Sequence, residues 1–157
     1  WEPFFLESQL NLMQKTSSLL VYGSHKRIDD KNQECLTPFY VPEKVTYTDL
    51  LKTCSITCLT GLYDTSKYGK VYLNEAFKSL RDDHIYWLDI LKMAGVAYGN
   101  PQIIGSYRIL GTSVSRNKKK VIIPQFKVYY ECEKLGLLKS LYYLTHWAIN
   151  GYFKYKK

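Results

Sequence analysis

The chain has 157 residues, of which 46% are hydrophobic and 15% aromatic, and its 22 Lys and Arg outnumber 14 Asp and Glu to give a formal charge of +8. This length fits one domain, and so large an apolar content excludes a disordered or collagen-like polypeptide. The sequence therefore predicts a single folded domain over residues 1–157.

Apolar residues in the first two thirds of the chain recur mainly at helical spacing. This spacing predicts an amphipathic helix over about residues 4–20, a second helix capped by Thr48, a short third helix capped by Asn74, and a fourth over about 83–97. Residues 22–45 show little periodicity, and we expect a long connection there.

The last third predicts a hairpin and then a long helix. Residues 102–110 and 120–130 are rich in Ile, Val, Tyr and Phe and flank a basic turn at 116–120, which is typical of a β-hairpin. An apolar helix is predicted over 134–153, with a basic tail at 154–157. The predicted fold class is α+β and mostly helical, with about four N-terminal helices, one β-hairpin and one long apolar C-terminal helix.

The predicted helices 83–97 and 134–153 are apolar on nearly all sides, which is typical of helices buried in a core, an interface or a membrane. We expect them to pack on neighbouring subunits through Tyr86, Trp87, Leu138, Leu141, Tyr142 and Trp147. The second helix also carries a polar stripe formed by Lys139, Tyr143, His146 and Asn150. These groups are costly in hydrocarbon, so the sequence favours an interfacial or subunit-buried helix over a membrane span.

Basic charge is concentrated at the C-terminal end. Residues 1–104 hold eleven basic and twelve acidic side chains, whereas residues 105–157 hold eleven basic and two acidic, a net charge of +9. Such a field attracts phosphates, anionic lipid or an acidic protein surface, or else serves solubility. The predicted anionic-partner site comprises Arg108, Arg116, Lys118, Lys119, Lys120 and Lys127.

No known catalytic or metal motif is present. His84 follows Asp82 and Asp83 and forms the best local acid–base cluster, but the start of a helix explains these residues more simply. The Gly-x-Ser-x-Gly, His-Glu-x-x-His and dinucleotide-binding signatures are absent, as are the paired Cys and His spacings of zinc sites. We therefore expect no catalytic residue, no metal and no cofactor.

These patterns favour a non-enzymatic structural subunit of a mitochondrial or other membrane-associated complex, with other protein subunits and anionic lipid as partners. The start at Trp1 rather than Met indicates a processed, imported or secreted chain. One alternative is an RNA-binding protein of an organellar ribosome, because basic and aromatic residues alternate near the predicted hairpin. Another is a secreted binding domain, in which Cys35, Cys54, Cys58 and Cys132 form two disulfides.

Overall fold

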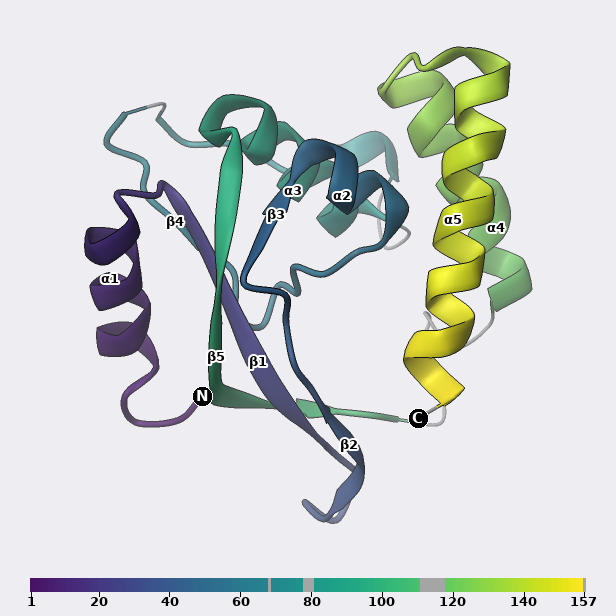
Figure 1. Ribbon diagram of the computed structural model, residues 1–157. Helices are drawn as coiled ribbons and strands as arrows, with labels where there is room; N and C mark the ends of the chain where they lie inside the picture. Colours follow the sequence, from purple (N-terminus) through teal and green to yellow (C-terminus); the bar gives the residue numbers. More distant parts are fainter. Residues whose placement is uncertain (68, 78–80, 111–117, 157) are drawn as a thin grey trace.

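A mixed sheet forms the centre of the molecule. The computed structural model describes residues 1–67, 69–77, 81–110 and 118–156 (Figure 1). Strand β1 (Leu20–Ile28) pairs in parallel with β5 (Val96–Arg108) and antiparallel with β2 (Glu34–Phe39) and the short β4 (Leu62–Tyr63). Strand β3 (Lys44–Thr46) runs antiparallel to β5, which gives the order β2-β1-β5-β3 with β4 beside β1.

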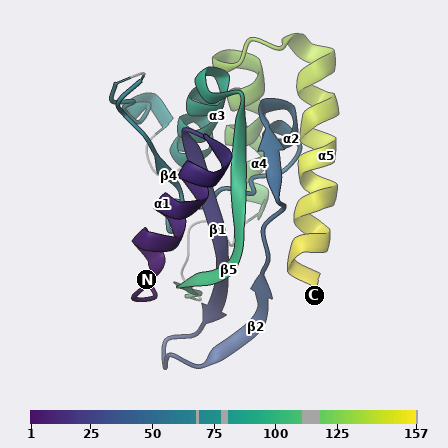
Figure 2. The same cartoon turned by 60° about the vertical axis from the view of Figure 1, so that its left-hand side comes forward.

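Helices lie on both sides of this sheet. Helix α1 (Phe5–Thr16) is on one side, and α2 (Tyr47–Lys52), α3 (Asp82–Ala94), α4 (Lys118–Lys127) and α5 (Gly136–Lys156) are on the other (Figures 1 and 2). The short 3-10 helix η1 (Glu75–Phe77) precedes α3, and the π-helical segment η3 (Val128–Cys132) joins α4 to the turn before α5.

The core lies between the sheet and α3. Leu20 and Tyr22 of β1 pack there with Leu50 and Leu51 of α2 and with Leu88 of α3, and all five are almost fully buried. Burial of such side chains contributes roughly 1.5–3 kcal/mol each relative to exposure. This core fixes α3 against the sheet.

Local signals explain where α2 begins and where α3 ends. Thr46 and Asp49 form a reciprocal capping box at the start of α2, so the cap lies two residues before the expected Thr48. Helix α3 ends at Gly95, whose φ of +76° is costly for residues with a side chain.

The predicted fold class was wrong, because the chain forms a five-stranded mixed sheet with 46% helix and 24% strand. Residues 22–45, expected to be a connection, contain most of β1, all of β2 and the start of β3. Strand β1 is buried along almost its whole length, so it lacks the alternating pattern that identifies half-exposed strands.

The predicted hairpin was also wrong. Residues 102–108 belong to β5, as expected for a strand, but β5 pairs with β1, and residues 120–130 form α4 and part of η3. Val121, Gln125 and Tyr129 are buried at steps of four, which is helical spacing. Residues 118–120 of the expected turn begin α4, and 116–117 lie outside the described residues.

The structure contains helices near both apolar segments singled out in the sequence, α3 and α5. Residues 154–156, expected as a tail, continue α5, and residue 157 lies outside the described part. In the part of the chain that the structure describes, neither of these helices nor any other is long and apolar enough to cross a membrane.

Candidate functional site

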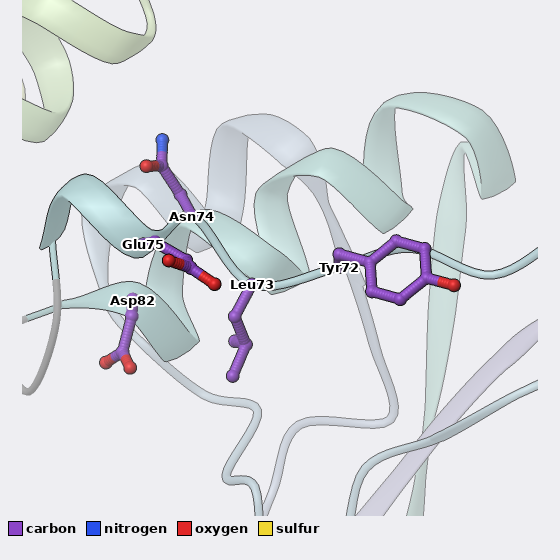
Figure 3. Close-up of a pocket in the computed structure, with 5 residues that line it drawn as sticks. All are labelled: Tyr72, Leu73, Asn74, Glu75 and Asp82. Carbon is purple, nitrogen blue, oxygen red and sulfur yellow. The ribbon is translucent and has the colours of Figure 1, made fainter.

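An open pocket lies between η1 and the first turn of α3. It has a volume of about 390 Å³ and is lined by Tyr72, Leu73, Asn74, Glu75 and Asp82 (Figure 3). The carboxylate of Glu75 comes from η1 and that of Asp82 from the first turn of α3. Tyr72 is 80% exposed, and its ring points away from these two carboxylates. The pocket thus combines two acidic groups with an exposed aromatic ring and an exposed Leu73 side chain.

Hydrogen bonds near the pocket give its polar residues different roles. The Oδ1 atom of Asn74 accepts the backbone N–H of Ala76 and caps η1, as its position in the sequence predicted. The Oδ1 atom of Asp83 accepts the N–H of His84 at 2.8 Å, at the start of α3. Asp83 therefore contributes to the helix start, whereas Asp82 lines the pocket.

A buried histidine fixes the start of α3. His84 is fully buried, and its Nε2 lies 3.0 Å from the carbonyl oxygen of Leu50 on α2. Its Nδ1 lies 2.9 Å from a guanidinium nitrogen of Arg81 and 3.1 Å from the amide nitrogen of Gln125 on α4. Because both of these neighbours are donors, Nδ1 accepts and Nε2–H donates to Leu50, which defines a neutral tautomer.

The surroundings of His84 keep it neutral. Burial, reinforced by the neighbouring charge of Arg81, lowers the pKa of His84 to about 3. This histidine therefore supports the pocket and is not available to exchange protons with a substrate there. The same Arg81 lies over the ring of Trp147 on α5, with its guanidinium carbon 5.4 Å from the ring centroid.

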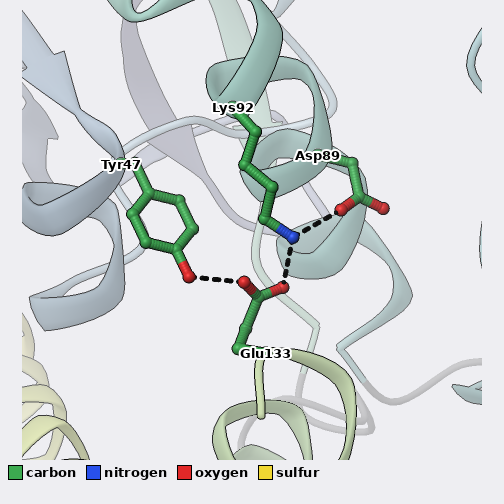
Figure 4. Close-up of polar contacts among 4 residues, drawn as sticks. All are labelled: Tyr47, Asp89, Lys92 and Glu133. Atoms are coloured by element: carbon green, nitrogen blue, oxygen red, sulfur yellow. Dashed lines mark hydrogen bonds and ion pairs between the residues drawn. The ribbon is translucent and has the colours of Figure 1, made fainter. Parts of the chain in front are cut away.

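A second polar cluster connects α2 and α3 with η3 (Figure 4). Glu133, whose side chain is only 2% exposed, accepts the hydroxyl hydrogen of Tyr47 and pairs with Lys92 at 2.9 Å. Lys92 also contacts Asp89 at 2.9 Å. Burial and the hydrogen bond to Glu133 raise the pKa of the Tyr47 hydroxyl, so it remains a donor at neutral pH. This cluster holds the segment before α5 against α3.

The structure describes only part of the predicted anionic-partner set. Arg108 donates to the Asp29 carbonyl and to Asn32 Oδ1, both at 2.7 Å, and so joins β5 to the β1–β2 turn. Lys127 lies on α4, 4.0 Å from Glu131. Residues 118–120 form the first turn of α4, and Arg116 lies outside the described residues.

The predicted helix interface divides between the core and the surface. Trp87 is buried and its ring packs edge-on against Tyr86 at 4.9 Å, so this part of the expected subunit interface lies inside the molecule. Leu138, Leu141 and Tyr142 are exposed on α5. The remaining member, Trp147, is partly buried beneath Arg81.

The predicted polar stripe has two members that face the protein and one that is exposed to solvent. Asn150 donates to the carbonyl of Lys52 at 3.1 Å, and the ring of Tyr143 lies 6.1 Å from that of Tyr129, so both face the protein. The ring of His146 packs against its own helix neighbour Tyr142 at 4.5 Å, and Lys139 is exposed.

The cysteines do not support a disulfide-stabilised domain. All four lie within the described residues, and none forms a disulfide. The described residues also contain no group of three or more His, Cys, Asp or Glu side chains that could hold a metal ion.

Similarity to known proteins extends over almost the whole chain. No family profile matches it. A putative teichuronic acid biosynthesis glycosyltransferase of Bacillus subtilis, TuaG, is 29% identical over 151 residues, 96% of this chain and 59% of the relative. An uncharacterized glycosyltransferase of Haemophilus influenzae is 34% identical over 161 residues, 97% of this chain and 60% of the relative.

A third relative has a more specific name. The Escherichia coli protein WfgD, a UDP-Glc:alpha-D-GlcNAc-diphosphoundecaprenol beta-1,3-glucosyltransferase, is 32% identical over 152 residues, 96% of this chain and 58% of the relative. The chain therefore spans about three fifths of the length of each of these proteins.

These similarities overturn the functional prediction from sequence. They point to an enzyme, not to a structural subunit or a ribonucleoprotein component. These relatives are bacterial, and WfgD is named for an acceptor linked to undecaprenol, so the mitochondrial and secreted locations were wrong as well. The missed residue Glu75 begins the short 3-10 turn η1, and Tyr72 lies three residues before it. No motif marks this segment in the sequence, and only the nearby pair Asp82 and Asp83 gave a signal.

Proposed function

We propose that this chain forms part of a glycosyltransferase that moves a sugar from a nucleoside diphosphate donor to a hydroxyl group of an acceptor. The observation that carries this proposal is the similarity of 96% or more of the chain to proteins named as glycosyltransferases. The name of WfgD supplies the first substrates to test, UDP-Glc as donor and a lipid diphosphate-linked GlcNAc as acceptor.

The pocket between η1 and α3 suits the acceptor. Sugar rings have apolar faces that pack on aromatic rings, and Tyr72 and Leu73 present such surface. Carboxylates accept hydrogen bonds from hydroxyl groups, and Glu75 and Asp82 supply them. An acceptor sugar in this pocket would meet apolar and acidic groups together.

The chemical step assigns a role to Asp82. The acceptor oxygen forms a bond to the anomeric carbon of the donor, and the bond from that carbon to the diphosphate breaks with its electron pair leaving on the phosphate oxygen. The hydroxyl proton passes to a carboxylate, which acts as general base. Asp82 is the candidate because it lines the pocket, whereas one oxygen of Asp83 is occupied by the N–H of His84.

The network around His84 positions this base. Its hydrogen bonds to Leu50, Arg81 and Gln125 attach the start of α3 to two other helices. A base held in this way does not have to rearrange during the reaction. Such positioning lowers the activation free energy, because the entropy of orienting the reacting groups is lost before the chemical step.

The experiment compares Asp82→Asn with the parent protein at its natural length, using UDP-Glc and a lipid diphosphate-linked GlcNAc acceptor. We expect kcat to fall by about 10²–10⁴-fold, the usual contribution of a general base. The KM for UDP-Glc and the far-UV circular dichroism should not change. Asp64→Asn is the control, because Asp64 is an exposed carboxylate that does not line the pocket.

Two outcomes would contradict the proposal. Loss of activity in Asp83→Asn but not in Asp82→Asn would remove the assignment of the base to Asp82. Absence of transfer from UDP-Glc and from a panel of other nucleotide sugars, in a protein that is folded by circular dichroism, would contradict the glycosyltransferase function itself.

A further inference from the structure

Helix α5 presents an apolar stripe to solvent. Leu138, Tyr142, Ile149 and Tyr152 lie near steps of three and four along the helix, and each is at least half exposed, with Leu138 at 84%. Leu137 and Leu141 extend the same exposed surface. A helix on the surface of a soluble protein usually turns its apolar stripe toward the core, and α5 does not.

The opposite side of α5 is the one that packs on the protein. Ser140 is buried, Asn150 donates to α2, and Trp147 lies under Arg81. The outward stripe is therefore not a consequence of a detached helix, because α5 is fixed along its length by its inner side.

The part of the chain that contains this helix is rich in lysine. Residues 118–157 contain nine Lys and two acidic side chains, and one of the acids, Glu133, is buried in its pair with Lys92. Lys134 and Lys139 are exposed near the start of α5. The antiparallel arrangement of α4 and α5 places residues 118–120 and 154–156, which include five Lys, at the other end of the helix pair (Figure 1).

We propose that the outward stripe of α5 and its flanking lysines dock on an anionic lipid surface, with the helix lying in the plane of the interface. Leu and Ile would enter the acyl boundary, Tyr142 and Tyr152 would sit at the level of the head groups, and the lysines would pair with lipid phosphates. Charge complementarity selects this occupant, because the exposed Lys134 and Lys139 lie near the start of the helix and the backbone segments at its other end contain five Lys in the sequence.

This docking would bring the pocket toward the lipid. Arg81 precedes the pocket residue Asp82 and contacts Trp147 on the inner side of α5, so a single layer of side chains connects the start of α3 with the docking helix. An acceptor attached to a lipid would then lie close to the candidate base. Only this last step rests on the proposed glycosyltransferase function, and the docking itself does not.

The test is co-sedimentation of the protein at its natural length with vesicles of phosphatidylcholine alone or with added phosphatidylglycerol. We expect binding to the anionic vesicles that weakens as salt is raised, because screening shortens the reach of the lysines. Leu138→Glu combined with Ile149→Glu should reduce the partition coefficient by at least about tenfold, since it places two carboxylates in the contact. Lys134→Glu combined with Lys139→Glu should weaken binding while leaving the apolar stripe intact.

The matched control is Leu6→Glu combined with Leu10→Glu. These two leucines are exposed on α1, on the far side of the sheet from α5 (Figure 1), and their replacement should leave binding unchanged. Equal loss in this control, equal binding to neutral and anionic vesicles, or self-association through α5 without vesicle binding would each overturn the proposal. Vesicle binding needs no sugar donor, so its failure is distinguishable from failure of the transferase assay.

Discussion

Helices α3 and α5 look alike in the sequence and have opposite environments in the structure. Both are apolar on nearly all sides, with few charges. Six side chains of α3 are buried, including Trp87 and Leu88, whereas Ser140 is the single buried one among the described side chains of α5. An apolar helix in the sequence thus indicates that its side chains favour burial. It does not indicate whether they are buried against the sheet of the same domain or remain exposed on its surface.

The difference comes from what each helix contacts. Helix α3 lies between the sheet and the other helices, and its one buried imidazole, His84, has hydrogen-bond partners on both ring nitrogens. Helix α5 contacts α2, α4 and η3 on one side only. The first helix belongs to the core, and the second combines a packed face with a face that is left for another surface.

The largest expected effect comes from truncating one leucine in each helix. Leu88→Ala on α3 should lower the free energy of unfolding by about 2–5 kcal/mol, because Leu88 is fully buried and a cavity would remain. Leu138→Ala on α5 should change it by about 0.5 kcal/mol or less, because that side chain is already in solvent. Urea unfolding measures both, and similar losses would mean that the two helices are equally buried in solution.

Sequence reasoning located the helices better than the sheet. The periodic segments at α1, α3 and α5 were recognised because helical spacing is a local property. The parallel pairing of β1 with β5 joins residues more than seventy positions apart, and no local pattern encodes it. Residues 120–130 were misread because Val, Ile, Tyr and Phe favour strands, although the buried positions Val121, Gln125 and Tyr129 repeat every four residues.

The candidate site was partly visible. Asp82, Asp83 and His84 were singled out as the best local acid–base cluster, and their place at a helix start was predicted correctly. The pocket was not predictable, because Tyr72 and Glu75 come from an irregular segment whose position depends on the packing of α3. The exposure of Leu138, Leu141 and Tyr142 is equally a tertiary property, since the sequence shows only that they are apolar.

An intermediate effect on the free energy of unfolding is expected when the pH is lowered, because His84 at the start of α3 is buried in its neutral form. The pKa of His84 is about 3 in the folded chain and about 6.5 when unfolded, so below pH 6.5 the unfolded state binds a proton that the folded state does not. The contribution of neutral His84 is therefore fully present above about pH 6.5 and falls by about 1.4 kcal/mol per pH unit below it.

The measurement is urea unfolding at several pH values between about 7 and 5, compared with His84→Gln, which cannot bind that proton. We expect the parent protein to lose stability more steeply than the variant as the pH falls, even though the variant is less stable at neutral pH. Parallel pH profiles would show that His84 has the same pKa in the folded and unfolded protein and is not held neutral at the start of α3.

The smallest expected effect on the free energy of unfolding comes from removing either of the two carboxylates between α4 and α5, Glu131 and Glu133. Glu133→Ala leaves the Tyr47 hydroxyl without its acceptor and Lys92 with Asp89 alone, and it should cost about 1–3 kcal/mol of unfolding free energy. Glu131→Ala removes only an exposed pair with Lys127 at 4.0 Å and should cost about 0.5 kcal/mol or less. Urea unfolding again gives both values.

Comparing Glu133→Ala with Glu131→Ala also tests whether the buried cluster fixes the start of α5. Because Glu133 holds the segment that leads into α5, hydrogen exchange in the first turns of α5 should become faster in Glu133→Ala, while exchange in the middle of α3 should not. Equal stability of the two variants would mean that the buried cluster does not fix α5. In that case the outward stripe would follow from the inner contacts of Asn150 and Trp147 alone.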